Sequence, residues 1–167
     1  MESEEFAEIL AAVRRFVDKE VIPAEDEIEE TDRIPDRIRE AAAEMGLFGY
    51  ALPEEYGGLG LSMSEEVQLA MAVGRTTPAF RSMFGTNNGI AGQVLVNFGT
   101  EDQQQRYLPG LASGELIGSF ALTEADAGSD PSGLRTKAVR TEDGGFRITG
   151  EKRFITNAPQ ADVFMVF

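Results

Sequence analysis

The chain has 167 residues, 42% hydrophobic and 26% charged, which suits one ordinary globular domain or two small ones. Its net charge of −14 argues against nucleic acid and anionic membranes as partners, because both attract basic surfaces. Cysteine and histidine are absent, which excludes disulfides, thiolate catalysis, a Ser-His-Asp arrangement and metal sites with Cys or His ligands. The N-terminus is acidic and no apolar run approaches the ~20 residues of a membrane span, so we expect a cytoplasmic protein without a membrane span.

The first third of the chain has the apolar spacing of amphipathic helices. Apolar residues between Phe6 and Val17 recur at three- and four-residue steps, which predicts a first helix. Pro23 and the acidic run 25–32 are expected to interrupt this pattern. A second helix is predicted between Pro35 and Gly46, with one shared face formed by Ile38, Ala41, Ala42 and Met45.

Two capping-box patterns predict the starts of further helices. Ser62 and Glu65 have the required spacing, and the helix that follows carries Val67, Ala70 and Met71 on one side. Thr100 and Gln103 repeat the pattern before another helix.

The stretch between these two helices, residues 78–98, is apolar and rich in small residues. We interpret it as one or two buried helices. The dipeptide Asn88-Gly89 is also compatible with a hairpin turn, although its flanks lack strict alternation.

After Gly114 the spacing changes to short strand-like runs, at residues 116–122, 134–140, 146–156 and 163–167. Residues 141–145 have the composition of a hairpin loop. We therefore predict a helical domain over residues 1–115 and a β domain over residues 116–167. The last run is still apolar where it ends, and an open apolar edge invites association. This pattern indicates an N-terminal piece of a longer protein, or one subunit of a split protein.

Two segments of the β half carry residues suited to a ligand site. Thr123 is followed by small residues that let backbone amides approach a ligand; Gly128 can adopt a positive φ and Ser129 adds a hydroxyl. A plain turn held by Asx and Ser hydrogen bonds is the alternative for this loop. Further on, Phe154 and Thr156 offer an aromatic face and a hydroxyl on a predicted strand, suited to a planar ring. The alternative there is an ordinary strand with a buried Phe.

Four passages, in this order along the chain, carry a resemblance to a known family: residues 52–58, 99–114, 120–130 and 150–157. The chain resembles the acyl-CoA dehydrogenases, flavoproteins that desaturate acyl-CoA thioesters. The resemblance implies an α+β multidomain fold, with an all-α N-terminal helical domain, the start of a β-barrel-like middle domain, and the family's C-terminal helical bundle absent from this chain.

The resemblance also implies the cofactor and the residues that touch it. By match to the family's motifs, the FAD contacts would be Phe120, Leu122, Thr123, Gly128, Ser129, Phe154, Ile155 and Thr156. Thr123 would donate to the pyrimidine edge, and Ser129 would also lie against the substrate. Phe154 stands where many members have Trp, and its smaller ring would alter the stacking on the flavin. Ala125 stands where Pro is common.

Three carboxylates of the first segment are candidate bases, and we interpret all of them as structural anchors of the loop: Glu124, Asp126 and Asp130. In the family the base is a Glu of the C-terminal bundle, so no catalytic residue and no metal ligand is assigned to this chain. The chain alone is expected to bind FAD weakly and to be inactive.

The remaining expectations concern partners and alternatives. The resemblance implies an acyl-CoA substrate, an electron-transfer flavoprotein as acceptor, and a homo-oligomer (dimer or tetramer) or a complementary chain. Two other functions stay open: an acyl-CoA oxidase or flavin monooxygenase of the same superfamily, and a non-catalytic subunit that pairs with a second chain.

Overall fold

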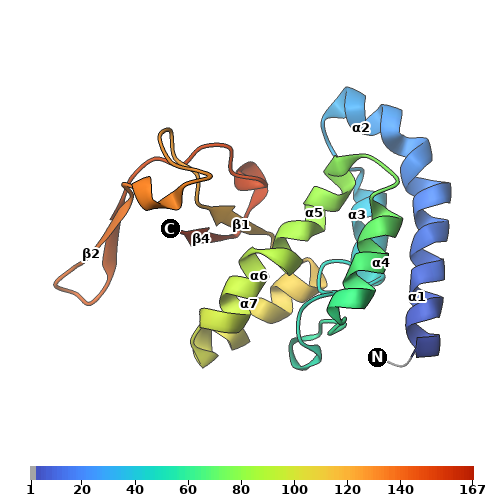
Figure 1. Cartoon of the computed structure of the whole chain (residues 1–167), viewed down its shortest axis with the longest axis horizontal. Coiled ribbons are helices and arrows are strands. Elements are labelled where there is room, and N and C mark those ends of the chain that lie inside the picture. Colours follow the sequence, from blue (N-terminus) through green and yellow to red (C-terminus); the bar gives the residue numbers. More distant parts are fainter. Residues whose placement is uncertain (1–2) are drawn as a thin grey trace.

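Helices form the chain up to Ser113, and short strands follow, in a computed structural model that describes residues 3–167. Figure 1 shows the helices on one side of the molecule and the strands on the other, with the hairpin of β2 farthest from α1. Within the described residues, no helix has both the length and the apolar character needed to cross a membrane.

The α-helices are α1 (Ser3–Phe16), α2 (Glu25–Thr31), α3 (Asp36–Glu44), α4 (Met63–Val73), α5 (Pro78–Gly89), α6 (Ala91–Phe98) and α7 (Glu101–Ser113). The strands are β1 (Gly118–Ala121), β2 (Lys137–Arg140), β3 (Phe146–Thr149) and β4 (Val163–Val166).

α1 ends at Phe16, and most of the acidic run forms a separate helix, α2, after the turns that contain Pro23. A π-helical turn, Val17–Val21, and a 3₁₀ turn, Ile22–Ala24, join α1 to α2. Pro23 sits in the first turn of the 3₁₀ segment, where a missing N–H costs little. Ile28 is the apolar residue of α2 that is buried, and it anchors the acidic helix to the core.

Both capping boxes are confirmed, and the buried face of α4 is not the side that carries Val67, Ala70 and Met71. Leu69, Ala72 and Val73 are buried. Val67 and Met71 are 51% and 71% exposed instead. Because α4 packs against α1, its orientation is set by that neighbour and not by its own apolar spacing, which is ambiguous.

Residues 78–98 form the two buried helices α5 and α6, and the hairpin alternative at Asn88-Gly89 is wrong because both residues end α5. The core of the helical half gathers around α5. The Phe80 and Phe84 rings meet edge to face, with centroids 5.2 Å apart, and the Phe84 ring also meets that of Phe48 at 6.0 Å. All three side chains are fully buried.

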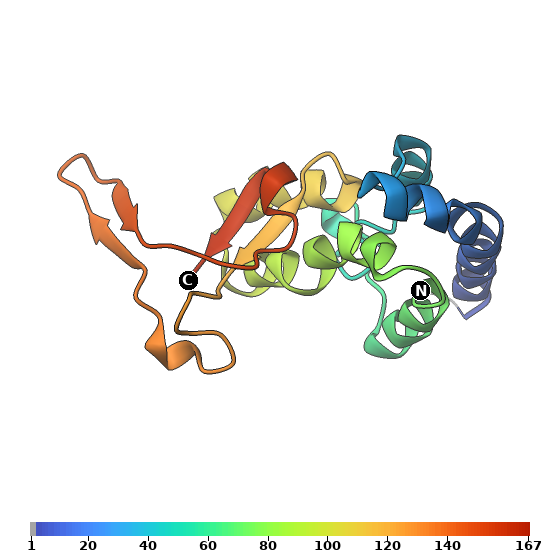
Figure 2. The same cartoon turned by 90° about the horizontal axis from the view of Figure 1, so that it is seen from above.

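The strands form two separate pairs. β1 pairs in parallel with β4, with Gly118 opposite Val163, and β2 pairs in antiparallel with β3, with Lys137 opposite Thr149. The predicted hairpin loop is confirmed: Thr141 N donates to the carbonyl of Gly145 at 2.9 Å. Every residue of β2 and β3 is exposed, and the hairpin projects away from the rest of the molecule (Figure 2).

Buried asparagines connect the helices to one another and to β1. Asn87 donates from Nδ2 to the carbonyls of Leu111 and Leu116, both at 2.9 Å, and its Oδ1 accepts from Gly118 N at 2.7 Å. Asn87 is fully buried, so these bonds fix the start of β1 on α5.

Candidate functional site

The two segments with ligand-site residues lie next to each other, just beyond the end of β1. We call residues 122–130 the β1 loop and residues 150–157 the crossing segment. Arg153 N, of the crossing segment, donates to the carbonyl of Thr123 at 2.9 Å. Further along, Ser119 Oγ donates to the carbonyl of Thr156 at 2.7 Å. The fold thus brings together residues 30 and 37 positions apart in the chain.

The crossing segment is not a strand, so the predicted run 146–156 is too long. β3 ends at Thr149, and the chain then continues without β pairing to the turn at Asn157. Phe154 has a φ of 56°, in the left-handed region, and its side chain is 88% exposed. The prediction that Phe154 lies on a strand beside a ligand was therefore wrong in its strand assignment. The alternative, a buried Phe of an ordinary strand, was wrong as well.

The β1 loop also differs from its prediction at Gly128. Its φ is not positive, unlike the φ of Gly114 or Gly144. A Cβ added to Gly128 would meet Thr123 Cγ2 at 3.5 Å, an ordinary contact, so the loop needs no glycine there for space. Gly128 and Thr123 nevertheless lie close together in the loop.

The remaining predicted residues differ in exposure. Phe120 is half-buried on β1 and its ring lies 4.6 Å from that of Phe167. Leu122, Thr123 and Ile155 are half-buried, while Ser129 and Thr156 are exposed. Hydroxyl groups that can donate hydrogen bonds and an exposed aromatic ring that can stack lie on two adjacent segments. Groups of these two kinds suit a planar heterocycle with polar edges.

Glu124 is the structural anchor that the sequence predicted. Its Oε2 accepts from Arg135 N at 2.7 Å, and its Oε1 accepts from Thr136 N at 2.9 Å, Thr136 Oγ1 at 2.5 Å and Lys152 Nζ at 2.8 Å. The hydrogen bond from Lys152, with those from Thr136 and Arg135, lowers the pKa of Glu124 to about 2. A carboxylate so fully bonded is a weak base.

The other two carboxylates also serve the loop. Asp130 Oδ1 accepts from Ser132 N at 3.0 Å and caps the short 3₁₀ turn Pro131–Gly133; bonding to Ser132 lowers the pKa of Asp130. Asp126 pairs with Arg135 at 3.4 Å on the surface.

Lys152 and Thr136 were not predicted from the sequence as partners of Glu124. Lys152 Nζ donates both to Glu124 and, at 2.8 Å, to the carbonyl of Leu122. The sequence does contain a signal for Lys152, which lies within the passage Gly150-Glu-Lys-Arg-Phe-Ile-Thr-Asn157. A lysine next to ligand-site residues is an indication of an acidic partner.

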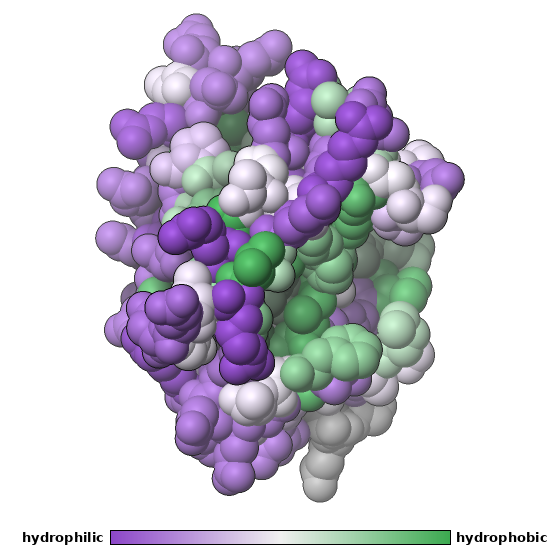
Figure 3. Space-filling view, turned by 90° about the vertical axis from the view of Figure 1, so that its left-hand side faces the viewer, coloured by the Kyte–Doolittle hydropathy of each residue, from purple (hydrophilic) through white to green (hydrophobic). Residues whose placement is uncertain are grey.

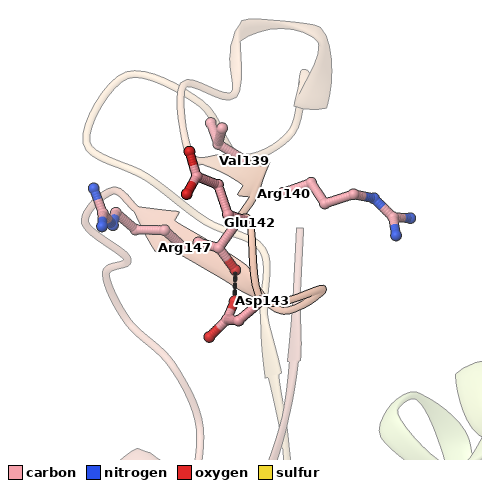
Figure 4. Close-up of a pocket in the computed structure, with 6 residues that line it drawn as sticks. Val139, Arg140, Glu142, Asp143 and Arg147 are labelled. Atoms are coloured by element: carbon pink, nitrogen blue, oxygen red, sulfur yellow. Dashed lines mark hydrogen bonds between the residues drawn. The ribbon is translucent and has the colours of Figure 1, made fainter.

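Two hollows lie elsewhere. The first, of about 620 Å³, is lined by hairpin residues including Arg140, Glu142 and Arg147. Figure 4 shows the guanidinium groups of Arg140 and Arg147 pointing apart, so they do not converge on a ligand. The second, of about 300 Å³, lies between α7 and β4 and is lined by Tyr107 and Met165 among others. Neither contains a predicted FAD contact, and no metal-binding group of acidic residues occurs within residues 3–167.

The face at the strand end carries exposed apolar side chains. Phe164, Val166 and Phe167, at the end of the chain, are 43%, 44% and 42% exposed. Figure 3 shows hydrophobic surface gathered in the hollow centre of this face, framed by polar residues.

A helical part that leads into short β strands defines the class as a two-part α and β protein, with the β1 loop and the crossing segment side by side. Family models place it further. Residues 3–115 match the acyl-CoA dehydrogenase N-terminal domain, and residues 119–167 match the acyl-CoA dehydrogenase middle domain. The chain belongs to the acyl-CoA dehydrogenase family.

Individual relatives agree with the family models. The chain is 40% identical to a probable acyl-CoA dehydrogenase of Bacillus subtilis over 167 residues, which are 99% of this chain and 28% of that protein. It is similar to the crystal structure of glutaryl-CoA dehydrogenase from Mycobacterium smegmatis, with a TM-score of 0.89 and 35% identity over 99% of this chain and 43% of that one.

A second solved structure contains the cofactor. Acyl-CoA dehydrogenase from Bacillus anthracis, complexed with FAD, matches with a TM-score of 0.87 and 37% identity, over 99% of this chain and 28% of that one. The chain thus spans between about a quarter and less than half of the length of these relatives.

Proposed function

We propose that the chain is the helical N-terminal domain (residues 1–115) and the first part of the β domain (residues 116–167) of an FAD-dependent acyl-CoA dehydrogenase. Such an enzyme is an oxidoreductase of fatty acid metabolism that introduces a double bond between the α and β carbons of an acyl-CoA thioester. Family membership and the FAD complex of the Bacillus anthracis relative support the proposal. The observation that carries it is the bond from Arg153 N to the Thr123 carbonyl, because it brings both matched motifs to one place.

The proposed FAD contacts are Phe120, Leu122, Thr123, Gly128, Ser129, Phe154, Ile155 and Thr156, with Ser129 also proposed to touch substrate. When bound, FAD supplies the acceptor for the β hydrogen as hydride. The Thr123 hydroxyl would donate to a polar edge of the ring. Phe154 would cover one face and exclude water, for which its 88% exposed side chain is available.

No residue of this chain is proposed as the base that removes the α proton. Glu124 has a pKa of about 2 because Lys152, Thr136 and Arg135 bond its charged form, and bonding to Ser132 also lowers the pKa of Asp130. A general base works best with a pKa near the operating pH, and both groups are far too acidic for that.

We further propose partners and a location. The acceptor would be an electron-transfer flavoprotein, and the chain would act in the cytoplasm, in keeping with its bacterial relative. A homo-oligomer, or pairing with a complementary chain, is supported by the exposed apolar side chains of Phe164, Val166 and Phe167. Nucleic acid is not a proposed partner, given a net charge of −14.

Titration of FAD against the purified chain, followed by flavin fluorescence and the visible spectrum, tests the proposal. Saturable, weak binding with a shifted flavin band is expected. Thr123→Val should weaken it, whereas Phe98→Ala, on the exposed side of α6, should not. Absence of saturable binding would contradict the FAD site. Bleaching of bound flavin by acyl-CoA, with turnover by this chain alone, would contradict the absence of a catalytic base.

A further inference from the structure

The contact between the β1 loop and the crossing segment is stabilised by interactions other than β pairing. β1 ends at Ala121 and β3 ends at Thr149, so both segments lie outside the paired strands. The bond from Arg153 N to the Thr123 carbonyl joins them directly. One backbone hydrogen bond near the surface stabilises the contact only weakly, because water competes for both groups.

A partly buried ion pair lies at this same junction. Lys152 Nζ is 2.8 Å from Glu124 Oε1, and the two side chains are only 12% and 9% exposed. The other ion pairs within residues 3–167 are different, since their side chains are 46% to 78% exposed. Exposed pairs contribute little to structure, whereas losing one partner of a buried pair leaves an uncompensated charge.

The hydrogen bonds of the pair connect three parts of the chain. Glu124 belongs to the β1 loop and accepts from both Arg135 and Thr136, just before β2. Lys152 belongs to the crossing segment and also donates to the Leu122 carbonyl. Because the carboxylate and the ammonium share their bonds with backbone groups, breaking the pair loosens the backbone itself.

The chain passes very closely over Thr136 to deliver Lys152 to this junction. A Cβ at Gly150 would lie 2.2 Å from Thr136 Oγ1 and 2.8 Å from Thr136 Cα. Only a residue without a side chain allows this approach. Gly150, two residues before Lys152, therefore allows the chain to place the lysine beside Glu124.

We propose that Glu124 and Lys152 are positioning residues of the flavin site, whose partly buried ion pair holds the β1 loop against the crossing segment. The proposal rests on the proposed function for the identity of the ligand. Neither residue needs to touch the ligand. With the pair broken, Thr123 and Phe154 would no longer keep a fixed separation, and a rigid planar ligand requires one.

Amide hydrogen exchange of the chain, followed residue by residue by NMR without FAD, tests the fastening. In Lys152→Met, the amides of Arg135, Thr136 and Arg153 are expected to exchange about tenfold faster, while those of α5 keep their wild-type rates. Lys152→Arg, which keeps the charge and the donors, should restore most of the protection. Glu124→Gln, which keeps the shape, should behave like Lys152→Met.

Arg135→Met is the matched control. It removes the exposed pair with Asp126 in the same region, while Arg135 N still donates to Glu124, so the same amides should keep wild-type exchange. Unchanged exchange in Lys152→Met or Glu124→Gln would overturn the proposal. An equal acceleration in α5 would also overturn it, since the pair would then support the whole fold and not the site.

FAD titration of the same variants separates this proposal from the proposed function. If the wild type binds FAD, Lys152→Met should bind it at least about fivefold more weakly, because an unfastened site must be ordered on binding. Equal affinity would overturn a role in positioning. If the wild type does not bind FAD, the proposed function fails, while the exchange rates still decide whether the ion pair fastens the two segments.

Discussion

The helical half and the β part of this chain are held together by different forces. The buried apolar side chains lie almost entirely in the helical half, and beyond residue 115 only Ile117, Ala121 and Ala127 join them. The β part has instead a partly buried ion pair, a network of polar bonds around Glu124, and a hairpin exposed along both strands. Apolar burial is therefore the main stabilising contribution in the first half, whereas polar bonds define the geometry of the second half.

The difference predicts that the same change has unequal effects in the two regions. Phe84→Ala removes a fully buried ring that meets Phe48, Tyr50 and Phe80, and is expected to cost about 3–5 kcal/mol of unfolding free energy. Phe154→Ala removes a ring that is 88% exposed and should change that free energy by less than about 0.5 kcal/mol.

Urea denaturation followed by far-UV circular dichroism measures both variants. Phe98→Ala, at 84% exposure in the helical half, is the control for the substitution itself. A large loss in Phe154→Ala would mean that the β part carries an apolar core of its own, and the comparison would fail.

The connection between the two regions is expected to be the next most sensitive place. Asn87→Ala leaves Gly118 N and the carbonyls of Leu111 and Leu116 without their partner in a buried site. Each such group costs about 1–3 kcal/mol, and three groups are left, so a loss of at least about 3 kcal/mol is expected.

Asn97→Ala is the control, because Asn97 is exposed and bonds only within its own helix region, to Gln93. Thermal and urea unfolding give the free energies, and amide exchange in β1 gives the location. If β1 kept its protection in Asn87→Ala, the asparagine would not be what joins strand to helix.

A smaller and more local effect is expected at Gly150. Gly150→Ala forces a Cβ into Thr136, and overpacking of this kind costs about 1–3 kcal/mol where the backbone cannot move. In the loosely held β part we expect the lower end of that range and faster exchange at Thr136. Gly133→Ala, whose Cβ would find only ordinary contacts from 3.5 Å, should leave exchange unchanged. Tolerance of both substitutions would show that the close approach at Gly150 is not required.

A further test concerns the pH dependence of stability that comes from Glu124. Its pKa is lowered from 4.5 to about 2, so its bonds stabilise the folded state fully above pH 4.5 and that stabilisation is lost as the pH falls through about 2. The stability difference between wild type and Glu124→Gln should therefore shrink from pH 4.5 to pH 2. Urea midpoints at several pH values measure it. A difference that stays constant over this range would contradict the lowered pKa.

Much of the helical half was predictable from the sequence because its signals are short-range. The capping boxes at Ser62 and Thr100 depend on residues three positions apart, and both are as predicted. In the β part, the loop at residues 141–145 is as predicted for the same reason, since its closing bond spans four positions. The family motifs led to the correct family for the same reason, since each is a short run of letters. The buried face of α4 was not predictable, because Leu69 and Met71 are both apolar and only α1 decides which is covered.

By itself, the sequence determined the change from helices to strands after Gly114, the anchoring role of Glu124 and the membership in the acyl-CoA dehydrogenase family. Tertiary structure alone decided the partner of Glu124, the exposure of Phe154 and the end of β3 at Thr149. Local spacing and capping act within a few residues, whereas Lys152 reaches Glu124 across 28 positions. That contact depends on the path of the chain over Thr136, which no local pattern encodes.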